Sequence, residues 1–289
     1  MKKIFNRLVI LSIIVTIMGS LSGCGVSIMG KEYTFFETPK RTESTIFDSV
    51  GSENSGEQQI SAENNISFIS TEIPAGNISI SKSETGKIEI KADIKVKGKD
   101  EDVKNDILNN SLVKLETSGD RAKLELQTKD GDGFWQWHKK YFSGYLITIN
   151  FYIEIPESME FDLSTGAGNI SIDDIEVALT ASTGAGNINL NNTKLTNEIE
   201  ISTGAGNVSI DGEFKDLNSL DIENGAGNIS LSLPSTTPME LSIDTGVGNV
   251  GGSIVKDNGF KNHSKQDING GGPKVEISSG VGNISVDGK

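Results

Sequence analysis

The feature that most constrains this chain is a six-residue word, Ser-Thr-Gly-Ala-Gly-Asn, which begins at residues 164, 182 and 202. The looser form Gly-(Ala/Val)-Gly-Asn-(Ile/Val) recurs at intervals of 18, 20, 21, 21 and 34 residues. An alternating apolar–polar stretch precedes each word and another follows most of them, which is typical of half-buried β-strands. One unit is therefore a strand, a corner, a second strand and a turn, about the length of one coil of a β-solenoid.

Glycine and asparagine at fixed places in each unit have a structural explanation. A tight corner needs a positive φ or a close backbone approach, and glycine supplies both at low steric cost. Asparagines that stack from coil to coil form a hydrogen-bonded ladder, and the aliphatic residue after each one fills the interior. The residues to which we assign this structural corner role are Gly166, Asn169, Gly184, Asn187, Gly204, Asn207, Gly225, Asn228, Gly246, Asn249, Gly280 and Asn283.

Two ligand interpretations of the word are weaker. A dinucleotide-binding loop has a third glycine and leads into a helix, whereas here a strand follows and the word recurs. Calcium-binding β-rolls repeat every nine residues or so and use aspartate, and Ca²⁺ takes about 6–8 oxygen ligands. Carboxylates that follow some corners leave a weak calcium site open as an alternative, at Asp173, Asp174, Asp211 and Asp287.

The amino-terminal residues indicate export. Lys2, Lys3 and Arg7 precede an apolar run at 8–21, which is too short to span a membrane comfortably. Small residues then lead to Cys24, as in a secretory signal. The stretch Leu-Ser-Gly-Cys resembles the lipobox of bacterial lipoproteins, and this resemblance implies cleavage before Cys24 and a lipid on its sulfur. We therefore expect an exported protein, lipid-anchored to the bacterial cell membrane and facing the cell wall or the exterior; the alternative is an ordinary signal peptide with a chance cysteine.

Composition and pattern together divide the chain. It has 26 Lys and Arg against 40 Asp and Glu, a net charge of −14, which disfavours nucleic acid as a partner. We predict an all-β fold, a right-handed β-solenoid with a less regular amino-terminal β portion. The expected segments are a signal peptide (1–23), a lipidated cysteine with a flexible tether (24–59), a β portion with a short helix near 100–110 (60–159), and the repeat solenoid (160–289).

No catalytic constellation stands out in the repeats. Residues 160–289 contain no Arg, Trp, Tyr or Cys and a single His, so we predict no enzyme activity, cofactor or metal. Abundant carboxylates leave a carbohydrate-active solenoid enzyme as an alternative. Trp135, Trp137 and Tyr141 in the stretch Phe-Trp-Gln-Trp-His-Lys-Lys-Tyr-Phe form a candidate binding surface. The favoured alternative is that these rings fill the transition between the β portion and the solenoid.

The repeats also resemble a known family. The stretches Ile-Pro-Ala-Gly-Asn-Ile-Ser-Ile at 73–80 and IEIPESMEFDLSTGAGNISI at 153–172, together with the serial corners, resemble the DUF4097 "putative adhesin" family and the related head-GIN-domain proteins. The resemblance covers roughly 60–289 and implies a β-solenoid with no catalytic residues to transfer. It implies a non-catalytic adhesin or envelope scaffold with a cell-wall or host glycan or protein as ligand. An accessory or sensor protein of cell-envelope stress is a further alternative.

Overall fold

The computed structural model describes residues 25–28, 31–34, 52–62, 65–156, 158–255 and 262–289. The chain divides into two compact units, residues 1–46 and 47–289. In the first unit β1 (Gly25–Ile28) pairs antiparallel with β2 (Lys31–Thr34). The signal peptide and Cys24 that the sequence predicts lie outside the described residues. Neither helix of the described part is long and apolar enough to cross a membrane.

Residues 53–59, which the sequence analysis assigns to the tether, belong to a strand. β3 (Glu53–Ala62) pairs along its whole length with β6 (Ile88–Lys97). β3 lacks the alternation of apolar and polar residues that marks other strands, because two of its less exposed residues are polar and hydrogen-bonded. Asn54 donates to Glu101 at 2.7 Å, and the Gln58 amide bonds the backbone of Ser111 and Val113 at 2.8 and 2.9 Å.

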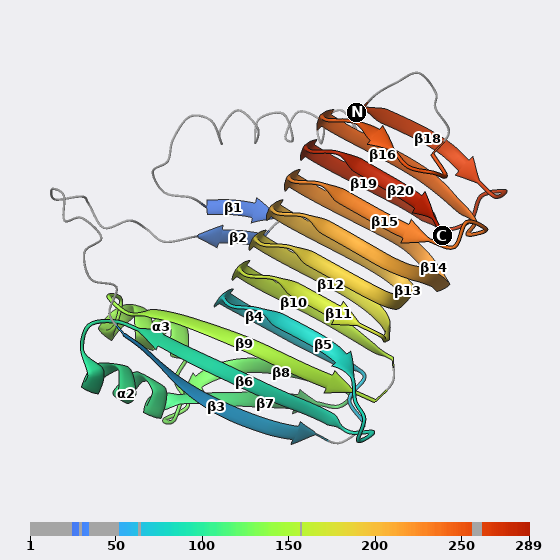
Figure 1. Ribbon diagram of the computed structural model, residues 1–289. Helices are drawn as coiled ribbons and strands as arrows, with labels where there is room; N and C mark the ends of the chain where they lie inside the picture. Colours follow the sequence, from blue (N-terminus) through green and yellow to red (C-terminus); the bar gives the residue numbers. More distant parts are fainter. Residues whose placement is uncertain (1–24, 29–30, 35–51, 63–64, 157, 256–261) are drawn as a thin grey trace, which may run out of the picture. The chain divides into compact units, whose positions relative to one another are not determined.

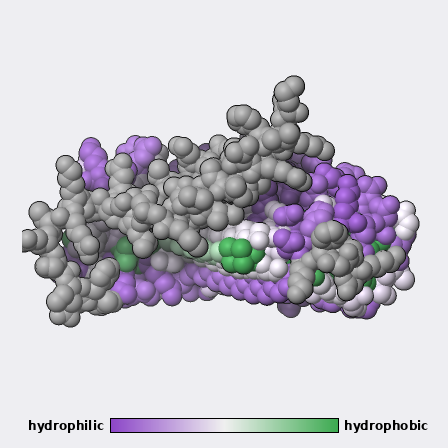
Figure 2. Space-filling view, turned by 90° about the horizontal axis from the view of Figure 1, so that it is seen from above, coloured by the Kyte–Doolittle hydropathy of each residue, from purple (hydrophilic) through white to green (hydrophobic). Residues whose placement is uncertain are grey.

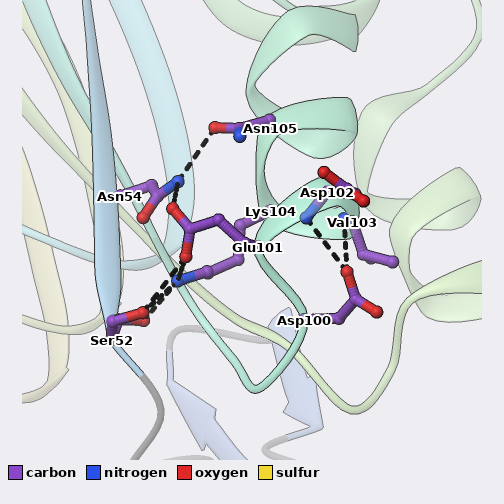
Figure 3. A network of polar contacts seen from close by, with 8 residues as sticks. All are labelled: Ser52, Asn54, Asp100, Glu101, Asp102, Val103, Lys104 and Asn105. Atoms are coloured by element: carbon purple, nitrogen blue, oxygen red, sulfur yellow. Dashed lines mark hydrogen bonds and ion pairs between the residues drawn. The ribbon is translucent and has the colours of Figure 1, made fainter.

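Residues that follow β6 form a short helix, α2 (Glu101–Asn110). Asp100 caps it, because its Oδ1 accepts the backbone N–H groups of Asp102 and Val103 at 3.0 and 3.1 Å. Lys104 is fully buried, and Figure 3 shows its Nζ between Ser52 and Glu101. It donates to the Ser52 carbonyl at 3.1 Å and pairs with Glu101 at 2.7 Å. These contacts fasten α2 to the start of β3.

The remainder of the β portion is a hairpin, a second helix and a long strand. β7 and β8 pair antiparallel around a turn at Gly119. α3 occupies the aromatic stretch, which the sequence analysis leaves without a helix, and β9 follows and pairs antiparallel with β6. Their bounds are β7 (Ser111–Ser118), β8 (Arg121–Thr128), α3 (Phe134–Tyr141) and β9 (Leu146–Ile155).

Beyond this portion the strands stack in two parallel rows (Figure 1). Each corner word lies where a strand of the first row gives way to a strand of the second. The first row runs, in space, β8, β4 (Phe68–Ala75), β10 (Met159–Ala167), β12 (Glu176–Ala185), β13 (Ile188–Ala205), β14 (Val208–Ala226), β19 (Lys274–Val281), β16 (Met239–Val247). The second runs β9, β5 (Ile78–Lys82), β11 (Ile170–Asp173), β13, β14, β15 (Ile229–Leu233), β20 (Ile284–Gly288), β17 (Val250–Gly251).

Two long strands join the rows. β13 and β14 each run from one corner to the next and so contribute to both rows. All described strands from β3 to β20 therefore belong to one hydrogen-bonded sheet. The all-β class predicted from the sequence is confirmed, and the right-handed winding stays a prediction.

The core lies between the two rows and is aliphatic. The residue after each corner asparagine is at most 1% exposed in five coils, at Ile170, Ile188, Val208, Ile229 and Ile284. Val250, in the outermost coil, is half-buried. Burying such a side chain contributes about 1.5–3 kcal/mol each, so stacking rather than any isolated coil stabilises the fold.

The order of coils in space differs from their order in the sequence. After β15 the chain passes over one position to form β16 and β17 at the end of the stack. β18 (His263–Ile268) then pairs antiparallel with β16. β19 and β20 return to lie between β14/β15 and β16/β17. The long interval between the last two corner words therefore contains an edge strand.

Candidate functional site: the stacked corners and outer strand faces

The corner asparagines lie in one hydrogen-bonded column. In each step a backbone N–H donates to the Oδ1 of the asparagine in the neighbouring coil, at 2.8–3.1 Å. Two members were not assigned from the sequence: Asn77, in the shortened word of β4 and β5, and Asn150 of β9, which no repeat marks. The spatial order of the column is Asn150, Asn77, Asn169, Asn187, Asn207, Asn228, Asn283 and Asn249.

A second column precedes the corners. The side chain of the residue before the first glycine of each corner donates a hydrogen bond to the carbonyl of a glycine in the neighbouring coil. Thr165 donates to Gly76 at 2.9 Å, and Thr183 donates to Gly168 at 2.9 Å. Asn224 occupies the same place and donates its amide N–H to Gly206 at 2.9 Å. The repeated residues therefore form two hydrogen-bonded columns, one before the glycine corner and one at the asparagine after it.

The left-handed conformation falls on the second glycine of each word rather than on the first. φ lies between +144° and +157° at these second glycines: Gly168, Gly186, Gly206, Gly227, Gly248 and Gly282. A Cβ at Gly206 would lie 1.9 Å from the carbonyl oxygen of Gly186. The first glycine Gly204 has no positive φ, although a Cβ there would lie 2.5 Å from the oxygen of Gly184. Both positions are crowded, but only the second also requires the conformation that favours glycine.

Of the aspartates considered for calcium, Asp173 and Asp174 are adjacent in one coil, Asp211 and Asp287 lie in two others, and all four bond protein donors. Asp173 accepts from Asn191 at 2.7 Å, Asp174 accepts from Asn192 at 2.6 Å, and Asp211 pairs with Lys289. Asp287 accepts from Ser285 at 2.6 Å. Within the described ranges, no group of three or more His, Cys, Asp or Glu side chains is placed to hold a metal ion.

Carboxylates gather on the outer face of the first row. Glu200, Asp221 and Glu276 are register partners on β13, β14 and β19, and Glu223 lies two residues beyond Asp221. Burial, the largest cause, and the negative charges of Glu223, Glu276 and Glu200 together raise the pKa of Asp221 to about 6, against the opposing effect of Lys274. This face therefore concentrates negative charge that the protein only partly compensates.

The raised pKa of Asp221 predicts a pH-dependent stability. The group binds its proton more tightly in the folded chain than in the unfolded one, so its contribution falls as pH rises from about 4 to about 6. We expect Asp221→Asn to stabilise the protein above this window by about 1 kcal/mol, an amount reduced by the partial exposure of Asp221. Thermal unfolding at pH 7.5 should show a Tm higher by about 2–4 °C, and the gain should vanish near pH 4. A gain of equal size at both pH values would contradict it.

The aromatic stretch faces mainly inward. Phe134 is fully buried, and its ring contacts Trp135 and Trp137 with centroids 5.3 and 5.5 Å apart. Both tryptophans are half-buried and pack against the core, whereas Tyr141 is 60% exposed. The structure thus brings the three candidate residues onto one helix, α3, with only the tyrosine largely free to meet a partner.

The two histidines lie in unrelated surroundings. His138 donates from Nε2 to the Tyr145 carbonyl at 2.9 Å, and burial lowers its pKa. His263 Nδ1 lies 3.2 Å from Asp244 on the outer edge of the first row. His138 belongs to α3 and bonds the residue before β9, whereas His263 belongs to β18 and contacts β16. The two histidines therefore form no common site.

A shallow groove of about 530 Å³ follows the turns after the second row. It crosses several coils, and its lining is polar and of mixed charge, with Lys82, Glu176, Lys194, Glu213 and Lys215 among its residues. Lys215 pairs with Glu176, and Lys194 lies 3.5 Å from Glu213. Figure 2 shows that hydrophilic residues predominate on the part of this face that is not drawn in grey. Such surfaces suit polar, extended ligands better than apolar small molecules.

Comparisons with known proteins place the repeats. The solved structures that resemble this chain include a "putative cell adhesion protein" from Clostridium sporogenes (20% identity, 82% of this chain, 100% of that chain, TM-score 0.47), a "putative adhesin" from Bacteroides fragilis (12%, 82%, 97%, 0.34) and a "putative adhesin" from Parabacteroides distasonis (10%, 83%, 98%, 0.31). No curated protein matches.

Two sequence families match the chain. Residues 151–216 match the family described as "Toastrack DUF4097", and residues 187–251 match the "N-terminal domain of toast_rack, DUF2154". The matched stretch contains five of the six corner words, those beginning at Gly166, Gly184, Gly204, Gly225 and Gly246. The resemblance to the DUF4097 family that the corner words predict is therefore confirmed over residues 151–216.

Proposed function

We propose that this chain is a non-catalytic, exported lipoprotein, an adhesin or envelope scaffold that contacts a glycan or protein through its stacked coils. The observation that carries the proposal is the register of the strands in the second row, which aligns polar side chains from coil to coil. Small polar residues occupy the same outward position in successive strands of the second row. This polar column comprises Ser79, Ser171, Asn189, Ser209, Ser230 and Ser285.

The polar column suits a repetitive partner. Its members are exposed or half-buried and recur at the strand spacing of about 4.8 Å. The next outward positions add Asp173, Asn191 and Asp211. Hydroxyls, amides and carboxylates in such an array donate and accept many weak hydrogen bonds, which is how a polymer rich in hydroxyl groups is held. Crowding of anchored copies on a membrane then multiplies weak contacts into avidity.

Right-handed winding of the coils is part of this proposal. Connections between parallel strands of one sheet are right-handed in nearly all proteins. An experimentally determined structure with left-handed coils would contradict it.

Binding to isolated cell walls tests the proposal. The protein should be residues 25–289 without lipid, because a start at residue 60 would remove most of β3. We expect this protein to sediment with the walls. Replacing Ser209 and Ser230 together by arginine should abolish sedimentation, because long side chains would disrupt the polar column. Ser219→Arg, on the outer face of the other row, is the matched control and should still bind.

The other outcomes are equally informative. Loss of binding with EDTA would support a bridging calcium ion at the carboxylates beside the column. Binding that survives the double substitution would show that the column is not the contact surface. If the unmodified protein binds neither walls nor arrays of host matrix proteins and glycans, the adhesin and scaffold proposal is wrong.

The anchor is a separate part of the proposal. The charged start, the apolar run and the lipobox-like residues before Cys24 support it. Cells that produce Cys24→Ala should release the protein from the membrane fraction, because no acyl chain would then hold it. Retention of the variant in that fraction would exclude lipidation as the anchor.

A further inference from the structure

The coil made of residues 274–289, here called the inserted coil, fills a slot between two coils that precede it in sequence. β14 and β15 form one wall of the slot, and β16 and β17 form the other. The chain reaches the far wall through residues 234–238 alone, since β15 ends at Leu233 and β16 begins at Met239. Every other corner word of the described chain lies in sequence order.

The slot holds its coil by the contacts of the repeated word. On one side Gly227 N–H donates to the Val281 carbonyl at 2.8 Å, and Asn283 N–H donates to the Asn228 side chain at 2.9 Å. On the other side Gly282 N–H donates to the Val247 carbonyl at 2.9 Å. An empty slot would leave these backbone groups without partners on both walls, and a strand edge in that state readily accepts another strand.

Each end of the inserted coil carries a lysine near acidic residues of the walls. Lys274 lies in register between Ser219 and Glu240 on the outer face. It pairs with Glu276 of its own coil at 2.8 Å, and Glu276, followed by Asp221 and Glu240 of the walls, raises its pKa. At the other end of the coil, Lys289 pairs with Asp211 of β14. Lys289 thus pairs with an acidic group of one wall, and Lys274 lies near Asp221 and Glu240 of the two walls.

The inserted coil is joined to β18 by a turn suited to a hinge. Asn269, Gly270 and Gly271 have φ of +49°, +92° and +80°, and Gly272 and Pro273 follow. Glycines of this kind adopt alternative backbone conformations at low steric cost.

We propose that the slot also accepts the inserted coil of a second copy of this chain, so that two copies are joined by exchange of this coil. The contacts in the exchanged pair are those seen within one chain, which is the condition for domain swapping. Anchored copies would meet at the high local concentration that favours exchange. Coil exchange is thus a means of linking copies, and it is independent of what the polar column binds.

Disulfide trapping between two single-cysteine variants tests the exchange. Glu223 of β14 and Ser278 of the inserted coil are register partners, so cysteines at these positions lie within disulfide reach. The full chain with Cys24→Ser serves as background. Glu223→Cys and Ser278→Cys chains are mixed at high concentration, incubated and oxidised. We expect a disulfide-linked species of two chains that contains one of each variant, as resolved by mass spectrometry.

Two controls make the result decisive. Thr180→Cys and Glu200→Cys are register partners on β12 and β13, and mixing these two variants should give no linked species above random collision, because these strands have no slot. The double variant Glu223→Cys/Ser278→Cys should close its disulfide within one chain, which shows that the geometry permits the bond. If the double variant closes while the mixed single variants link no more than the control pair, the proposal is overturned.

Discussion

Replacing Gly206 by alanine is expected to lower the free energy of unfolding by at least about 3 kcal/mol. φ is +150° at this residue, and the new Cβ would lie 1.9 Å from the Gly186 carbonyl oxygen. The neighbouring coil must therefore move, which breaks the step of the asparagine ladder between Asn207 and Asn187 (2.8 Å). Chemical denaturation monitored by circular dichroism measures the loss.

Gly119→Ala separates the two causes. Gly119 also has a positive φ, +65°, but a Cβ there would meet nothing within 4 Å. Its replacement should cost only the conformational term, about 1–2 kcal/mol. If the Gly206 variant lost no more stability than the Gly119 variant, collision between stacked corners would not be what fixes the glycine of the word.

The second large effect is expected from Phe134→Ala, with a loss of about 3–5 kcal/mol. The ring is fully buried and lies in contact with both tryptophans of α3. Its removal leaves a cavity where the helix meets the core, so α3 should loosen and tryptophan fluorescence should shift to the red. Urea unfolding and the emission maximum report the two consequences.

Tyr141→Ala is the matched control for this helix. Tyr141 is 60% exposed, and truncating it should change stability by less than about 0.5 kcal/mol. This pair of variants distinguishes the two roles that the sequence leaves open for the aromatic stretch. A large loss at Phe134 with none at Tyr141 indicates packing, whereas a small loss at Phe134 would contradict it.

Local features of the fold could be read from the sequence because each depends on few neighbouring residues. The alternation before and after each word predicts strands, and the aliphatic residue after each asparagine points into the core in every coil. The sequence pattern predicts neither β3 nor α3, for two different reasons. Asn54 and Gln58 of β3 bond polar groups of α2 and β7, so the strand lacks an apolar pattern. In α3, the rings of Phe134, Trp137 and Tyr141 recur at helical spacing, but eight residues are too few for that spacing to predict a helix.

The candidate surfaces were only partly predictable. The corner residues were assigned from repetition alone, yet Asn150 completes the column from a strand without the word, and nothing in its sequence marks it. The carboxylate cluster at Asp221 arises only when β19 places Glu276 beside it. Residues 55 positions apart in sequence become neighbours there, and no local pattern carries that information.

By itself the sequence determined the unit: strand, threonine, glycine corner, asparagine, buried aliphatic residue, strand. Only the tertiary structure decided the order in which the units stack. The physical reason is that the word gives every coil the same upper and lower surface, so backbone and asparagine bonds cannot distinguish one neighbour from another. The connections at 234–238 and 269–273, the pairing of Lys289 with Asp211 and the place of Lys274 near Asp221 and Glu240 distinguish them, and these act only between strands that have already come together.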